Sequence, residues 1–495
     1  MSDATEALSR VDTAWLRMDT DVNLMMIVGV WLLQPAIRCD ALVERIRQRL
    51  LPYPRFRARV AQGALASSWV VDDNFDLARH VVLETLPRRR GQTERAAPQL
   101  RMGELASTPL DQAHPLWQFH FIAHYEGGSA LICRIHHCIG DGVALNSVVM
   151  SIADDGVTPP QLAGQGAGPC SDQAGPASRD EPDTHQGDWV SDELLRPLTG
   201  LAVKAIEMYG EGLVKSMQAL AHPRQTWREA LGLLNHGRHL LGDLGELALM
   251  PNDARTSLKG HGNGRKVMAW CEPLPLDKVL AVAKALDASI NDVLLSCVAG
   301  AIGRYLRDRG EVPAGQDIRA MVPVNLRPLE EAWQLGNRFG LLPLLVPVGI
   351  ANPVERLAVV RQRMTALKRS FQPLLTYGIL TVSGLLTRRG QQALSGLFLD
   401  KTTAVMTNVP GPREALKVCG ATLKQTIFWV PSSGDVGLGV SIISYGGGVQ
   451  LALVTDQQLC PEPSRIIHRF GIEFEQLLLL TLMLPWAGQG EARPT

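Results

Sequence analysis

Hydrophobic residues recur in two different periods along the chain, which predicts a mixture of helices and strands. Residues 40–51 repeat apolar side chains every three to four positions, as an amphipathic helix does, and Asp40 is expected to cap that helix. Residues 117–124 repeat them every second position, which predicts a strand with Phe119 and Phe121 on one side. The apolar face of the predicted helix consists of Leu42, Val43, Ile46 and Leu50.

The C-terminal part of the chain repeats this mixture of periods. The pattern predicts helices over 276–286, 291–306 and 470–484 and strands over 340–350 and 436–443. Ser289, followed three positions later by Asp292, is typical of a capping box at the start of the second of these helices. A chain of 495 residues is too long for one ordinary core, so the sequence predicts an α/β protein of two domains.

The composition changes abruptly between the two halves. Residues 156–188 are rich in Gly, Pro, Ser and Asp, which predicts a disordered linker, with a lid over a functional site as the alternative. Residues 189–258 return to helical spacing and predict amphipathic helices that join the halves, either packed on the domains or facing lipid. The flanking segments are then an N-terminal domain, 1–155, and a C-terminal domain, 259–486, followed by a disordered tail, 487–495.

Charge and composition argue against several classes of protein. The net charge is zero, which gives no reason to expect a nucleic-acid partner. No apolar run reaches the roughly 18–20 residues that span a bilayer, and residues 1–19 are too polar for a signal peptide. The eight cysteines are scattered without a Cys-x-x-Cys pair, which suits free thiols in a reducing compartment. The expected location is therefore the cytoplasm.

The sequence His-His-Cys-Ile-Gly-Asp-Gly at 136–142 carries the clearest chemistry. It follows the apolar run 130–135 and precedes a helical pattern over 143–153, so the histidine pair lies where a buried strand turns into a helix. A neutral imidazole there can take a proton from an incoming hydroxyl or amine, which typically contributes ~10²–10⁴-fold to rate. The alternative is a histidine without a catalytic role, whose polar atoms are simply hydrogen-bonded at the end of a strand.

The other residues of this motif suggest roles in the turn. Asp141 can fold back to hold the turn or the ring, and Gly142 permits a backbone angle that other residues resist. Zinc binding is disfavoured, because neighbouring side chains on a strand point to opposite faces and no Cys or His cluster supplies further ligands. We therefore expect no metal.

This motif and five further regions resemble the bacterial wax ester synthase/acyl-CoA:diacylglycerol acyltransferase family. That family belongs to the superfamily of chloramphenicol acetyltransferase-like, CoA-dependent acyltransferases and condensation domains. The matching segments follow the family's order and extend the resemblance to about Asp456. They are Pro-Leu-Asp and Pro-Leu-Trp within 108–117, Asn-Asp within 291–294, and the segments 323–327, 335–340 and 407–412.

The resemblance implies a fold and a reaction. The fold is an α/β sandwich of two chloramphenicol acetyltransferase-like domains that meet along a tunnel. The reaction moves a long-chain acyl group from acyl-CoA to a long-chain alcohol or to diacylglycerol, without a covalent acyl-enzyme and without a cofactor. His137 is then the general base, His136 supports the turn, and Asp141 pairs with an arginine, for which Arg327 and Arg338 are candidates.

Other residues receive roles from the same resemblance. Thr407 and Asn408 are candidate donors to the oxyanion that forms on the thioester carbonyl, the alternative being a strand that ends in a turn. Residues expected to serve the structure are Asn291 and Asp292 at a helix start and Pro115, Leu116 and Trp117 in packing, where they also suit the wall of an acyl channel.

The resemblance and the apolar segments together suggest where the protein acts. Its substrates would come from a lipid droplet or the inner-membrane surface, to which the apolar end at 477–484 would adhere. Two alternatives stay open. One is a related condensation-type enzyme that uses another thioester donor, and the other is a non-catalytic lipid-binding relative.

Overall fold

A computed structural model gives the architecture of most of the chain outside one long central segment. The described residues are 6–63, 67–86, 94, 96–156, 250–311, 315–327, 331, 333–368, 372–384, 391, 401–431 and 435–483. The predicted linker lies outside them beyond residue 156, and the predicted joining helices lie outside them as far as residue 249. The predicted tail, 487–495, also lies outside the described residues.

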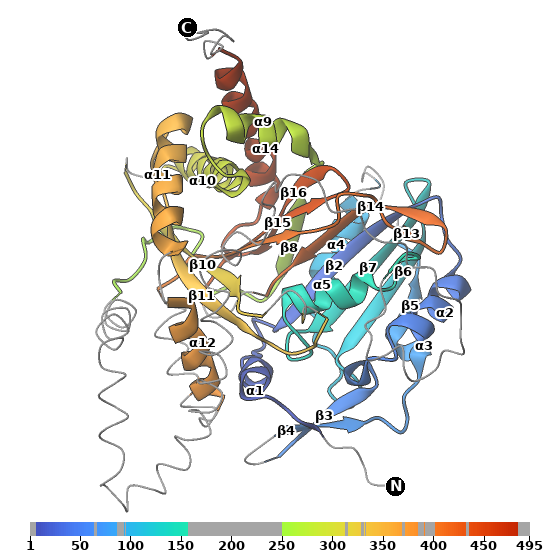
Figure 1. Cartoon of the computed structure of the whole chain (residues 1–495). Coiled ribbons are helices and arrows are strands. Elements are labelled where there is room, and N and C mark those ends of the chain that lie inside the picture. Colours follow the sequence, from blue (N-terminus) through green and yellow to red (C-terminus); the bar gives the residue numbers. More distant parts are fainter. Residues whose placement is uncertain are drawn as a thin grey trace, which may run out of the picture.

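Two large β-sheets, one from each half of the chain, form the framework (Figure 1). The six-stranded N-terminal sheet has the order β13 (Lys417–Val418), β14 (Ala421–Trp429), β2 (Met26–Gln34), β7 (Gly128–His136), β6 (Trp117–Tyr125) and β5 (Val81–Glu84). The seven-stranded C-terminal sheet has the order β11 (Phe339–Val346), β10 (Ile318–Asn325), β12 (Ala404–Pro410), β15 (Leu438–Tyr445), β16 (Gly448–Asp456) and β8 (Lys266–Trp270), with β9 (Leu274–Pro275) beside β16. A small third sheet joins β1 (Glu6–Ala7), β4 (Ser67–Val71) and β3 (Ala58–Gln62).

The C-terminal half contributes strands to the N-terminal sheet. Strand β14 comes from the C-terminal half but pairs antiparallel with β2 of the N-terminal sheet, from Thr422 opposite Gln34 to Trp429 opposite Val28. The predicted domain boundaries assign β14 to the C-terminal domain and do not account for this pairing. Because β14 completes the N-terminal sheet, the N-terminal half does not form its framework alone.

Helices cover both sheets. On the N-terminal half these are α1 (Arg10–Arg17), α2 (Cys39–Arg49), α3 (Leu77–His80), α4 (Ala96–Ala106) and α5 (Gly142–Met150), with the short 3₁₀ helix η1 (Pro54–Phe56). On the C-terminal half they are α9 (Leu276–Ala285), α10 (Ile290–Asp308), α11 (Pro353–Lys368), α12 (Gln372–Ser383) and α14 (Pro463–Met483). Among the described helices none is alone long and apolar enough to span a membrane, and α9 and α10 reach that length only as a pair bent by 97°.

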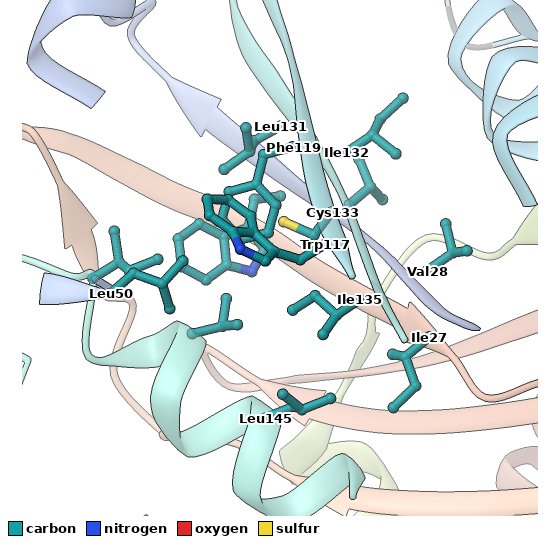
Figure 2. Close-up of a cluster of buried hydrophobic side chains, with 14 of the residues drawn as sticks. Ile27, Val28, Leu50, Trp117, Phe119, Leu131, Ile132, Cys133, Ile135 and Leu145 are labelled. Carbon is teal, nitrogen blue, oxygen red and sulfur yellow. The ribbon is translucent and has the colours of Figure 1, made fainter. Parts of the chain in front are cut away.

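Each large sheet has its own hydrophobic core. The N-terminal core joins β6 and β7 to α5, where Trp117, Phe119 and Leu145 are buried (Figure 2). The C-terminal core surrounds α10, which is buried along most of its length. A third, smaller cluster lies at the seam between the halves and includes Trp15 and Phe339.

The elements predicted from the sequence are present, with shifted ends. Ser289 and Asp292 form the predicted capping box of α10. The predicted cap of α2 is wrong: the helix begins after Arg38, which makes no side-chain cap, and Asp40 lies in the first turn. Helix α14 begins at Pro463 rather than at 470, because the buried side chains of Pro463 and Ile466 extend its packed face.

Candidate active site

The histidine motif lies at the turn between β7 and α5, as predicted. β7 ends at His136, and Asp141 caps α5, since its Oδ1 accepts a hydrogen bond of 2.9 Å from the Ala144 backbone N–H. The proposed reason for Gly142 is wrong, because its φ is not in the left-handed region. A Cβ atom added to Gly142 would instead meet no atom of the described residues within 4 Å, so there is space beside this position at the start of α5.

His136 belongs to the support of the turn. Its Nδ1 accepts a hydrogen bond of 3.1 Å from the Cys138 backbone N–H, and its Nε2 lies 3.2 Å from an Asp19 carboxylate oxygen. Nδ1 therefore carries no proton, and the ring's proton on Nε2 points at Asp19. Within the described part of the chain, no three His, Cys, Asp or Glu side chains gather where they could hold a metal ion.

His137 presents a neutral imidazole. Its side chain is buried, and its ring stacks on the Trp15 indole with 4.3 Å between ring centroids and 12° between planes. Burial lowers the pKa of His137 to about 4, while the nearby Asp141 carboxylate, the residue's own backbone and Asn337 oppose this shift. Nδ1 is buried and has no partner at hydrogen-bond distance among the described residues. Near neutral pH the ring is therefore unprotonated and able to accept a proton.

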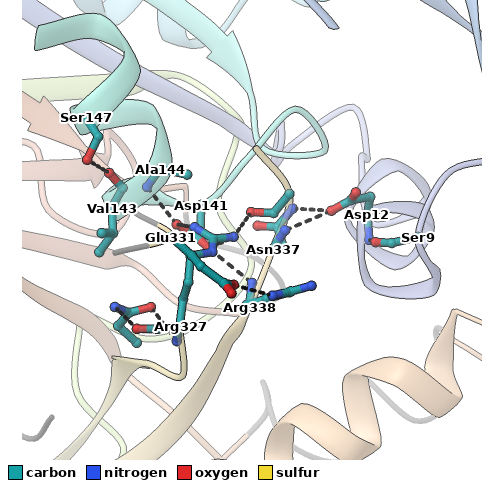
Figure 3. Close-up of polar contacts among 12 residues, drawn as sticks. Ser9, Asp12, Asp141, Val143, Ala144, Ser147, Arg327, Glu331, Asn337 and Arg338 are labelled. Atoms are coloured by element: carbon teal, nitrogen blue, oxygen red, sulfur yellow. Dashed lines mark hydrogen bonds and ion pairs between the residues drawn. The ribbon is translucent and has the colours of Figure 1, made fainter. Parts of the chain in front are cut away.

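The Asp141 carboxylate joins the two halves of the chain through contacts with Arg327 and Arg338 (Figure 3). Its carboxylate lies 3.2 Å from the Arg327 guanidinium and also accepts the Arg338 backbone N–H at 3.0 Å. The Asp141 and Arg327 side chains are both almost fully buried. The structure thus distinguishes the two predicted arginines: Arg327 pairs with Asp141 through its guanidinium, whereas Arg338 contacts it through its backbone N–H.

Three further residues hold the same turn, and sequence reasoning did not single them out for this role. Asp12 of α1 is fully buried, and its Oδ1 accepts hydrogen bonds from Asn337, through the backbone N–H at 3.1 Å and through Nδ2 at 2.8 Å. Asn337 Nδ2 also donates to the His137 carbonyl oxygen at 2.8 Å. Arg55 donates to Asp12 at 3.1 Å and to the Ile139 carbonyl at 3.0 Å.

The electrostatic state of Asp12 follows from this burial. Desolvation raises the pKa of Asp12, and Arg55, Asn337 and Ser9 oppose the rise. A carboxylate within an otherwise apolar stretch of a short helix was the one sequence signal available. It shows that a residue is buried and paired but not which distant residue it pairs with.

The predicted oxyanion donors lie in the C-terminal half. Thr407 and Asn408 of β12 line a small cavity that is partly open to solvent. The Thr407 hydroxyl lies within hydrogen-bond distance of Ser441, and Asn408 donates to the Asn291 side chain. The residues around the cavity are Asn291, Leu295, Val322, Met406, Thr407, Asn408 and Ile442.

Among the described residues that line this cavity, His137 is absent. Among the described residues no hydrogen bond or ring contact joins Thr407 or Asn408 to His137. Their role as oxyanion donors stays a prediction.

The remaining motif residues serve packing. Pro115, Leu116 and Trp117 are buried, and Trp117 Nε1 donates to the Phe56 carbonyl at 2.8 Å. Asp292 completes the capping box of α10, and Asn291, in the same first turn, accepts the hydrogen bond from Asn408.

Comparisons with known proteins give consistent results. Residues 8–294 match the family model of the wax ester synthase/diacylglycerol acyltransferase catalytic domain, and residues 335–478 match that of the WS/DGAT C-terminal domain. A curated relative from Mycobacterium tuberculosis (strain ATCC 25618 / H37Rv), named "Probable diacyglycerol O-acyltransferase tgs1", is 24% identical over 477 residues and covers 94% of each chain.

Solved structures agree on the fold. The wax ester synthase/diacylglycerol acyltransferase from Marinobacter aquaeolei VT8 has a TM-score of 0.63 at 19% identity and covers 96% of this chain and 100% of its own. The first condensation domain of the CDA synthetase has a TM-score of 0.56 at 15% identity, with 97% of each chain covered. The predicted α/β fold, related to condensation domains, is confirmed.

Proposed function

Because the chain belongs to the wax ester synthase/diacylglycerol acyltransferase family and is an acyltransferase, we propose that it uses long-chain acyl-CoA as donor and a long-chain alcohol or diacylglycerol as acceptor. The products would be a wax ester or a triacylglycerol. The observation that carries the proposal is the neutral His137 imidazole at the turn that precedes α5, beside the open first turn of that helix.

The proposed chemistry follows from the substrates. A thioester is already activated, so the reaction needs neither a cofactor nor a covalent acyl-enzyme. An alcohol, in contrast, is almost fully protonated at neutral pH. His137 removes that proton as the alcohol oxygen attacks the thioester carbon, and the carbon–sulfur bond then breaks. The ring passes the same proton to the departing CoA thiolate and returns to its neutral state.

The walls of the small cavity at β12 and α10 are mainly apolar, which favours contact with an apolar group. They include Leu295, Val322, Met406 and Ile442, beside the polar Asn291, Thr407 and Asn408. An apolar wall discriminates one methylene from the next by only ~0.8 kcal/mol. We therefore expect a broad range of chain lengths, with long acyl chains preferred over acetyl.

We place this activity at a cytoplasmic lipid surface, either a droplet or the inner membrane. Support comes from the last turns of α14, which extend outward from the C-terminal half (Figure 1). There Leu479, Leu482 and Met483 are 60%, 73% and 80% exposed, and Leu480 is also exposed. At about 100° per residue, these four positions fall within roughly 160° of the helix circumference, so they form one apolar face. Such a face can lie against the acyl layer of a membrane or droplet.

The test of the proposed function uses the purified full chain. Palmitoyl-CoA is offered with hexadecanol or with diacylglycerol, and free thiol and ester are both measured. We expect thiol and ester to appear in equal amounts and the folded His137→Ala variant to form almost no ester. Near-full activity of folded His137→Ala would remove the base from the mechanism.

The same assay separates the alternatives. Ester formation only from a carrier-protein thioester would favour a condensation-type enzyme. Binding of palmitoyl-CoA without thiol release under all acceptors would favour a lipid-binding relative. A strong preference for acetyl-CoA and a small polar acceptor would also contradict the proposal.

A further inference from the structure

Helix α1 lies at the seam between the two halves. On one side Val11 and Trp15 belong to the seam cluster, which also contains Leu326, Phe339 and Tyr377 from the C-terminal half. Leu16, on another face of the same helix, packs into the core of the N-terminal half. The helix therefore contacts both halves next to the turn that carries His137.

The C-terminal half holds α1 closely. The buried Gln391 side chain donates a hydrogen bond of 2.7 Å to the Ala14 carbonyl. A Cβ atom on Gly384 would lie 1.9 Å from the Arg10 carbonyl oxygen, so only glycine permits this approach. These contacts leave the helix little freedom to shift relative to either half.

Two side chains of α1 reach the histidine by different routes. The Trp15 indole stacks directly on the His137 ring, at 4.3 Å and 12°, and Phe339 lies against both rings. The Asp12 carboxylate holds Asn337, whose Nδ2 donates to the His137 carbonyl. One contact orients the ring and the other orients the backbone from which the ring projects.

We propose that α1 is the positioning element of the general base, with Trp15 holding the His137 ring by stacking and Asp12 holding its backbone through Asn337. This inference rests on the proposed role of His137. Neither side chain takes part in the chemistry. A base displaced by about 1 Å can lose on the order of 100-fold in rate, because proton transfer depends steeply on geometry.

The Trp15 side chain offers a conservative substitution. Its Nε1 is buried without a hydrogen-bond partner, so Trp15→Phe removes ring area but no hydrogen bond. Trp15→Leu keeps an apolar side chain and removes the stack. Leu16→Ala is the matched control, since it removes packing from the same helix but within the N-terminal core.

Steady-state kinetics at saturating acyl-CoA test the ring contact. We expect Trp15→Leu to lower kcat by about 10–100-fold with KM changed by less than roughly threefold, because a positioning contact matters in the transition state and not for substrate binding. Trp15→Phe should restore most of the lost kcat. Leu16→Ala should keep kcat near that of the parent protein, even if it lowers the melting temperature as much as Trp15→Leu does.

Histidine NMR gives a readout that does not depend on activity. The His137 ring signal, assigned by its loss in His137→Ala, should lie upfield because of the stacked indole. Trp15→Leu should abolish that upfield shift, and Asp12→Ala should reduce it by letting the backbone of His137 move. An unshifted signal in the parent protein would contradict the stack itself.

Three outcomes would overturn the inference. The first is a folded Trp15→Leu variant with unchanged kcat. The second is a loss of kcat no larger than that of Leu16→Ala. The third is a rise of KM at constant kcat, which would make Trp15 a substrate contact. Each is distinct from failure of the proposed function, which active His137→Ala would show.

Discussion

Asp141 is buried next to the histidine motif, yet three contacts of its carboxylate serve to hold the turn. It caps α5, pairs with Arg327 and accepts the Arg338 backbone N–H (Figure 3). Its charge still acts on the His137 ring through space and favours the protonated form. We therefore assign Asp141 mainly to the join between the two halves.

The two arginines provide the first prediction. Arg327→Ala should lower the free energy of unfolding by about 3–5 kcal/mol, because it leaves the buried Asp141 carboxylate without its countercharge. Arg338→Ala keeps its backbone N–H on Asp141 and should change stability little. Urea denaturation of both variants checks this. Equal losses would show that Asp141 does not depend on the Arg327 charge.

The pKa of His137 provides the second prediction. The ring titrates at about 4 in the folded protein against an ordinary value of 6.5, so the unfolded chain binds more protons between these two values. The contribution of His137 to stability is therefore present above pH 6.5 and is lost as pH falls through 4. Melting temperatures measured from pH 7 to pH 4 should fall less steeply in His137→Gln than in the parent. Parallel curves would contradict the lowered pKa.

The sequence could locate the base but not its supports. The histidine motif is continuous in the chain, so its place at a strand end was predictable from the apolar run before it. Asp12, Arg55 and Asn337 lie far apart in sequence and meet only in the folded protein. Choosing Arg327 over Arg338 likewise required the direction of each side chain, which no local pattern contains.

At the scale of elements, one of the two predicted helix caps is present and the other is not. Ser289 caps α10 as predicted, because its hydroxyl and the Asp292 carboxylate each meet a backbone N–H. Asp40 does not cap α2, because its carboxylate bonds Arg38 and its neighbour Ala41 instead. Helical spacing locates the buried face, but the cap depends on the chain direction before the helix.

These two helix starts provide the third prediction. Ser289→Ala should lower the free energy of unfolding by about 0.5–2 kcal/mol, as the loss of an N-cap does. Asp40→Ala, on an exposed residue that does not cap, should leave the melting temperature unchanged. Thermal denaturation of the two variants side by side is the measurement. A larger loss of thermal stability in Asp40→Ala than in Ser289→Ala would indicate that Asp40 caps α2, as the sequence predicted.

At the scale of the whole molecule, the halves are joined by more than their covalent connection. Strand β14 completes the N-terminal sheet, and Asp141 with Arg327 links the two halves in the buried seam. Periodicity could predict each strand but not that a strand near residue 425 pairs with one near residue 30. Pairing between distant segments depends on the fold of the entire chain.

The N-terminal sheet, which both halves build together, provides the fourth prediction. A specific protease site inserted between residues 157 and 187 should allow cleavage of the chain into two fragments that stay together. They should elute as one species from a sizing column without denaturant and should keep their activity. Fragments that separate under those conditions would contradict the shared N-terminal sheet.

The apolar end of α14 provides the last prediction. The combined variant Leu479→Gln, Leu482→Gln and Met483→Gln should weaken binding to phosphatidylcholine vesicles at least about tenfold, because burying one leucine in an acyl layer is worth roughly 1.5–3 kcal/mol. Leu83→Gln with Leu345→Gln is the matched control, since these leucines are exposed on β5 of the N-terminal sheet and on β11. Vesicle co-sedimentation measures binding, and turnover of a detergent-dispersed acceptor shows that the site is intact. Equal binding by the variant and its control would remove α14 as the lipid contact. Loss of turnover together with loss of binding would instead indicate that this end of α14 is needed for the C-terminal core to fold.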